Sequence, residues 1–208
     1  AKNILEQSPQ IDYQQMVLDE SRFRMQCSGN VKRIAVAMHN YHETHGRFPP
    51  ASRYGPDGNT LHSWRVALLP FLGHADLHEK YDFDEPWDGP NNLKLLEENP
   101  AVYRCPKVDG DSTNSSYFVL TGPTTVFSGT EGTRKRDIID GTNGTLLVVE
   151  AVQEIPWTKP EDIPYDPAGP LPKLGGMHSG GSYGSFADGS VRWIGDTMSE
   201  KCFGPSIT

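Results

Sequence analysis

The sequence predicts an α+β fold in which a long N-terminal helix packs on an antiparallel β-sheet, with short helices inserted between them. Two observations favour this fold. Apolar residues recur at spacings of three and four in the N-terminal part of the chain, as they do on one face of a helix. After residue 101 the apolar runs are short, rich in β-branched and aromatic residues, and bounded by Gly, Pro, Asn or Asp. An amphipathic helix needs an apolar surface to cover its face, and a sheet would supply it.

The first predicted element is a helix from about Tyr13 to His45. Gly46 favours a left-handed cap at its end, and Pro49 and Pro50 prevent it from resuming. The first half of this segment is much less apolar than the second, so we expect that half to project or fray. The residues predicted to form the apolar face are Cys27, Val31, Ile34, Ala35, Met38 and Tyr41.

Short helices and then strands follow. The predicted helical segments are Leu61–Leu72, broken by Pro70, then Asp76–Tyr81 and Asn91–Glu98. The predicted strands are Val102–Cys105, Tyr117–Thr121, Thr145–Ala151, Ser182–Ala187 and Val191–Ile194. The last two flank Asp188-Gly189, which we interpret as the two central residues of a tight hairpin turn.

Composition excludes some classes of function. The chain has 208 residues, with 27 acidic and 19 basic residues and a net charge of −8, which argues against a dedicated nucleic-acid binder. No stretch approaches the roughly 18 apolar residues of a membrane span, and no signal-peptide pattern opens the chain. Its three cysteines fit neither a Cys-x-x-Cys metal motif nor a dense disulfide scaffold. One disulfide with a free thiol and three buried thiols both remain open.

The segment Gly180–Gly184 matches the G-x-S-x-G pattern of a serine hydrolase around Ser182. That motif requires a strand before the serine, a helix after it and a histidine later in the chain. Here a hairpin follows, and all seven histidines precede Ser182. We therefore expect no enzyme activity from this motif.

Two groups are weak candidates for binding a metal ion. His39, His42 and His45 lie within one arc of the long helix, although histidines also favour helix C-termini because of the helix dipole. Asp109 and Asp111 resemble the start of a calcium loop that lacks its later ligands, and a polar turn is the favoured interpretation. The sequence thus predicts no cofactor, with calcium left open.

Other residues have both a structural and a functional interpretation. The four tryptophans, Trp64, Trp87, Trp157 and Trp193, would suit carbohydrate stacking, but we expect them to anchor the core and loops. Glu150 follows the apolar run LLVV and is a candidate buried carboxylate. Alone it supports no reaction, because acid–base chemistry needs a positioned partner.

Several segments together resemble one family. They are Arg24–Ile34, Ala37–His42 with Phe48–Pro50, Ser63–Val66 with Leu69–Leu72, Tyr103–Pro106, Asp140–Asn143, and His178 with Asp188–Arg192. This ordered set resembles a family of pilin-like bacterial proteins of unknown function, abundant in planctomycete-type bacteria, with a C-terminal H-x9-D-G signature. The resemblance implies a type IV pilin or pseudopilin-like fold over residues 20–195. It leaves residues 1–19 as a polar extension or fragment boundary and 196–208 as a tail.

The resemblance also implies a role. We expect a non-enzymatic, extracytoplasmic protein that contacts other envelope or pseudopilus-like proteins, in envelope assembly, secretion or surface interaction. It would bind no nucleic acid, and it would reach the membrane only through an N-terminal helix that residues 1–19 do not contain. The alternative is a carbohydrate- or calcium-binding module on the same scaffold, because fold alone does not fix function.

Two structural predictions follow from the matched segments. Cys27 and Cys105 both lie in them, whereas Cys202 lies in the unmatched tail, so we expect Cys27 and Cys105 to form a disulfide. The signature residues His178, Asp188 and Gly189 are expected to be structural. A hydrogen bond from His178 to Asp188 or to a hairpin carbonyl would hold the glycine-rich loop against the sheet.

Overall fold

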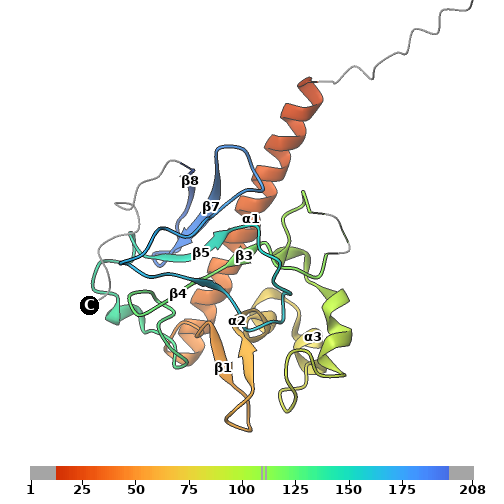
Figure 1. Ribbon diagram of the computed structural model, residues 1–208, viewed down its shortest axis with the longest axis vertical. Coiled ribbons are helices and arrows are strands. Elements are labelled where there is room, and N and C mark those ends of the chain that lie inside the picture. The colour runs from red at the N-terminus through yellow and green to blue at the C-terminus, as the bar shows by residue number, and fades with distance from the viewer. Residues whose placement is uncertain (1–12, 109, 111, 197–208) are drawn as a thin grey trace, which may run out of the picture.

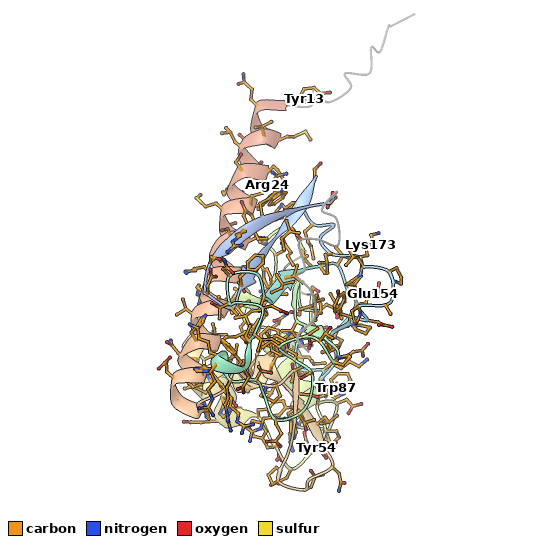
Figure 2. All side chains as sticks on the ribbon, turned by 90° about the vertical axis from the view of Figure 1, so that its left-hand side faces the viewer. Tyr13, Arg24, Tyr54, Trp87, Glu154 and Lys173 are labelled. Atoms are coloured by element: carbon orange, nitrogen blue, oxygen red, sulfur yellow. The ribbon has the colours of Figure 1, made fainter. Side chains whose placement is uncertain are left out.

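A computed structural model describes residues 13–108, 110 and 112–196. Helix α1 (Tyr13–His45) has the predicted bounds, and its N-terminal part stands clear of the other elements (Figure 1). The side view shows Tyr13 at the N-terminal end of α1, with the other described elements along one side of the helix below it (Figure 2). Within the described residues, no helix combines the length and apolarity that crossing a bilayer requires.

The apolar face of α1 is buried as predicted, because Cys27, Val31, Ile34, Ala35, Met38 and Tyr41 are all inaccessible or nearly so. The helix ends where Gly46 adopts a φ of 73° and its N–H donates to the carbonyl of His42. This left-handed cap confirms the role predicted for Gly46.

The main sheet contains four strands in the order β3-β5-β7-β8, and all three pairings are antiparallel. Its strands are β3 (Tyr117–Phe118), β5 (Leu146–Glu150), β7 (Gly181–Phe186) and β8 (Val191–Gly195). Helix α1 packs across β5 and β7 (Figure 1). The predicted α+β arrangement is therefore confirmed.

The two faces of the sheet contact different cores. Tyr117 and Val148 pack in the main core with α1, whereas Phe118 and Val149 belong to a smaller core on the other face. The smaller core is closed by a parallel pair, β4 (Leu120–Thr121) and β6 (Ile163–Pro164). Because successive strand residues point to opposite faces, Glu150 lies on the same face as Val148, toward α1.

The segment between α1 and the sheet differs in part from the prediction. Its elements are β1 (Ser52–Tyr54), β2 (Leu61–Ser63), α2 (Trp64–Ala67), α3 (Ala75–Lys80), and the 3₁₀ helices η1 (Leu69–Leu72) and η2 (Asn92–Glu98). The predicted helix over Leu61–Leu72 is wrong at its start, where β2 pairs with β1. Helix α2 begins only after Ser63, whose side chain accepts a hydrogen bond from the Arg65 N–H.

The predicted strand Val102–Cys105 is also wrong, since this stretch forms the 3₁₀ helix η3 (Ala101–Tyr103). Proline flanks it at Pro100 and Pro106, and proline cannot donate to a strand ladder. A further 3₁₀ helix, η4, spans Lys135–Asp137.

The β7–β8 hairpin is confirmed, but its turn is not the predicted two-residue one. The Phe186 N–H donates to the Ser190 carbonyl across a three-residue loop, and the Gly189 N–H donates to the Phe186 carbonyl. Only Gly189 of this loop has a positive φ, 84°, which is typical of a type I turn followed by a glycine bulge. The Asp188 carboxylate accepts from the Ser190 N–H at 2.8 Å and so stabilises the loop.

Candidate buried thiol, histidine and carboxylate cluster

Among the described residues, the helix histidines belong to no group of three potential metal ligands. His39 Nε2 is buried without a hydrogen-bond partner among the described residues, and burial lowers the pKa of His39. His42 Nε2 accepts from the Lys135 N–H at 3.1 Å, and His45 Nδ1 lies 3.0 Å from the Tyr41 carbonyl. The rings of His39 and His42 both pack against Phe48. Asp109 and Asp111, the calcium candidates, lie outside the described residues.

Ser182 lies inside strand β7 and is buried, with the hairpin after it. This context lacks the sharp strand-to-helix turn that exposes a nucleophilic serine. Trp64 and Trp157 are fully buried, as expected for core anchors, so neither can stack on a bound sugar.

The predicted hydrogen bond from His178 to Asp188 or to a hairpin carbonyl is wrong, because the two ring nitrogens face Glu20, Cys105 and Glu150 instead. His178 Nδ1 lies 2.9 Å from Oε1 of Glu20 on α1, and Asp188 instead contacts Ser190 and Arg192. The three-residue loop directs the Asp188 side chain back toward its own hairpin, where the carboxylate accepts hydrogen bonds from Ser190 and Arg192.

Four buried side chains meet between α1 and the sheet. They are Cys27, Cys105, Glu150 and His178, and one ligand atom from each lies within 4.8 Å of all the others. The two sulfurs are 2.9 Å apart as free thiols, Cys105 Sγ is 3.7 Å from His178 Nε2, and that nitrogen is 3.5 Å from Glu150 Oε1. The first three side chains are fully buried, and His178 is 3% exposed. The structure thus brings the predicted cysteine pair together, and the disulfide stays a prediction.

Each member comes from a different part of the fold. Cys27 lies on the buried face of α1, and Glu150 ends β5 opposite Tyr117 of β3. Cys105 follows η3, where its N–H donates to the Ser116 hydroxyl at 2.9 Å. The loop that carries His178 returns along β5 through hydrogen bonds between Gly175 and the backbone of Glu150 and Val152.

Glu20 supports the cluster from the outside. It precedes Arg24 and Cys27 by four and seven residues, so all three lie on one face of α1. Its carboxylate accepts from Arg24 Nε at 3.0 Å and Lys107 Nζ at 2.9 Å, in addition to its contact with His178. Burial alone would raise the pKa of Glu20, but hydrogen bonds from Lys107, Arg24 and His178 outweigh it and lower the pKa to about 2.

The electrostatics of the cluster favour a neutral Cys27 thiol when only protein groups are present. The hydrogen bond to Cys105, then burial and the charge of Glu150, raise the pKa of the Cys27 thiol. Both carboxylate oxygens of Glu150 are buried without a hydrogen bond among the described residues. A buried carboxylate without hydrogen bonds is costly, so this cluster has the character of a binding site for a cation.

Part of this cluster is visible in the sequence. The sequence places Cys27 on the apolar face of the helix and pairs it with Cys105. It also singles out His178 and the apolar run before Glu150, but nothing in the sequence links these residues to the cysteines. Glu20 was missed because its half of the helix has little apolar character. Its spacing from Cys27 was the one available signal.

A family model described as "Protein of unknown function (DUF1559)" matches residues 21–125, just over half of the chain. The match includes Cys27 and Cys105 and ends before Glu150 and His178. Neither the curated proteins nor the solved structures gave a match to this chain. The chain therefore belongs to the DUF1559 family, whose function is unknown.

Proposed function

We propose that this chain is a non-enzymatic, pilin-like extracytoplasmic domain that acts through contacts of its long helix with other envelope proteins. The observation that carries this proposal is the projecting part of α1, which leaves apolar side chains without cover (Figure 2). Tyr13, Met16 and Val17 are 74%, 55% and 65% exposed and share one helix face by their spacing.

The remainder of the domain is consistent with this role. The second half of α1 is fixed by its buried face, so the projecting half extends from a rigid base. Exposed apolar side chains on one face favour packing against a neighbouring helix, as in assemblies of pilin-like proteins. The buried position of Ser182 supports the non-enzymatic part of the proposal.

The proposal is tested by photo-crosslinking in cells that produce the protein at its natural level. A photoreactive residue replaces Met16 or Val17, and the matched control places it at Ile139, an apolar residue that is 63% exposed elsewhere on the domain. We expect crosslinks to envelope proteins or to a second copy from the helix positions, and none from Ile139. Equal crosslinking at all three positions, or recovery of the protein in the cytoplasm, would contradict the proposal.

A further inference from the structure

We propose that Cys27, Cys105, Glu150 and His178 form a structural zinc site that fastens helix α1 to the sheet. This goes beyond the proposed function, since the site lies in the interior of the domain and not on its contact surface. Three features of the cluster point to zinc: the donor set, the unpartnered carboxylate and the orientation of the histidine.

The donors suit zinc. Two thiolates, one imidazole nitrogen and one carboxylate oxygen make up a four-ligand set, and structural zinc sites are closed and tetrahedral. The sulfur pair disfavours calcium and magnesium, which prefer oxygen ligands. Zinc–ligand bonds of about 2.0–2.3 Å place tetrahedral ligands roughly 3.3–3.8 Å apart. His178 Nε2 lies at such separations from Cys105 Sγ, 3.7 Å, and from Glu150 Oε1, 3.5 Å. The two sulfurs, at 2.9 Å, would have to separate by about 0.9 Å, and all four ligand atoms already lie within 4.8 Å of one another.

Glu150 is the observation that points directly to a cation. Its carboxylate is fully buried, and within the described residues both oxygens lack a hydrogen bond, with Nε2 of His178 nearby at 3.5 Å. A metal ion would supply the missing partner. Two thiolates and this carboxylate carry three negative charges, so zinc would leave a net charge of −1. The neighbouring group of Glu20, Lys107 and Arg24 carries a net charge of +1.

The orientation of His178 fits a metal ligand. Its Nδ1 faces the Glu20 carboxylate at 2.9 Å, so this nitrogen is the donor and Nε2 presents its lone pair to the cluster. Histidines that bind metal ions commonly donate their other N–H to a carboxylate in this way. Arg24 and Lys107 hold Glu20 in place from the other side.

A surface hollow borders the cluster. Cys105 forms part of its wall, together with Gln26, Asn30 and Arg104. Both cysteines are fully buried, so an ion would bind during folding or through a local opening of the packing around them. A disulfide between Cys27 and Cys105 is the competing outcome, because it would consume both sulfur ligands and leave Glu150 with only His178.

The test is zinc content by elemental analysis of the full chain, purified anaerobically without reductant and without chelator. We expect about one zinc per chain in the wild type and in the matched controls Cys202→Ser and His39→Gln, which change a cysteine and a half-buried histidine that are not among the four proposed ligands. Cys105→Ser and His178→Gln should lose the zinc. Glu20→Gln should retain it with an affinity about 10–100-fold lower in a chelator competition.

A second measurement on the wild type does not depend on the folding of any variant. Cobalt(II) added to the metal-free chain should give the intense visible bands and the sulfur-to-cobalt charge-transfer band of tetrahedral thiolate coordination. Absence of metal from the wild type, with a Cys27–Cys105 disulfide in peptide mapping, would overturn the proposal. Full zinc retention in Cys105→Ser and His178→Gln would also overturn it.

Discussion

At the scale of single residues, Arg65 shows how a buried charge can organise this domain. Its guanidinium is fully buried, lies 2.7 Å from Asp162 Oδ1, and donates to the Tyr117 carbonyl. Asp162 also accepts hydrogen bonds from the Trp64 indole and the Val119 N–H, each at 3.0 Å. The pair thus joins α2, β3 and the segment before β6 at one point.

We predict that Arg65→Met destabilises the domain by about 3–5 kcal/mol, because it leaves the Asp162 carboxylate buried without its cation. The measurement is the free energy of unfolding in urea. The matched control is Lys80→Met, which removes an exposed ion pair with Glu98 and should change stability little. Equal effects of the two substitutions would contradict the importance given to burial.

His62 makes the stability of the domain depend on pH. Its ring is buried between the Tyr81 hydroxyl at Nδ1 and the Phe83 carbonyl at Nε2. Burial is the largest effect on the pKa of His62 and lowers it, while the hydrogen bond to Phe83 acts in the opposite direction. The unfolded chain therefore binds more protons than the folded one as the pH falls below about 6.5.

The sign of this linkage gives a prediction. The contribution of neutral His62 to stability is complete above about pH 6.5 and is lost as the pH falls toward the lower, folded-state pKa. We expect the wild type to lose more stability between pH 7.5 and pH 5.5 than His62→Gln does. Urea unfolding at both pH values measures the difference, and parallel losses would refute the assignment.

At the scale of elements, the backbone requires glycine in the hairpin loop but not in the long helix. Gly189 has a φ of 84°, and a Cβ there would meet His39 Nε2 at 3.4 Å. Gly29 lies within α1, and a Cβ there would meet nothing within 4 Å. Glycine is therefore required in the hairpin loop, while in the helix it only adds flexibility.

We predict opposite effects of alanine at these two positions. Gly189→Ala should destabilise the domain by about 1–2 kcal/mol, because a residue with a side chain is strained at positive φ. Gly29→Ala should stabilise it by about 0.5–1 kcal/mol, since alanine favours the helix. Denaturant unfolding of the two variants side by side is the test, and the same sign for both would contradict it.

The elements also show which sequence signals were sufficient to predict secondary structure. Helix α1 was predictable because its apolar spacing repeats over several turns and ends at Gly46. The strand Leu61–Ser63 was not predictable, because three residues are too few to show an apolar periodicity. Their pairing with Ser52–Tyr54 decides their conformation. The prediction of a strand at Val102–Cys105 failed for the same reason, since a short apolar run suits either a strand or a buried helical turn.

At the scale of the whole molecule, the cluster exists only because the fold assembles it. Cys27, Cys105, Glu150 and His178 are spread over more than 150 residues and follow no metal-binding motif. The sequence predicted two of them as a pair, and it placed His178 beside the wrong partner. Their convergence depends on the packing of α1 on β5 and on the return of the loop before β7, which no local pattern encodes.

If zinc at this cluster fastens α1 to the sheet, X-ray absorption at the zinc edge of the purified chain should reveal the ligands. We expect a first shell of two sulfur ligands at about 2.3 Å and two nitrogen or oxygen ligands at about 2.0–2.2 Å. The matched Cys105→Ser variant should contain no zinc. A zinc shell without sulfur in the wild type, or a wild type that binds no zinc, would contradict the account.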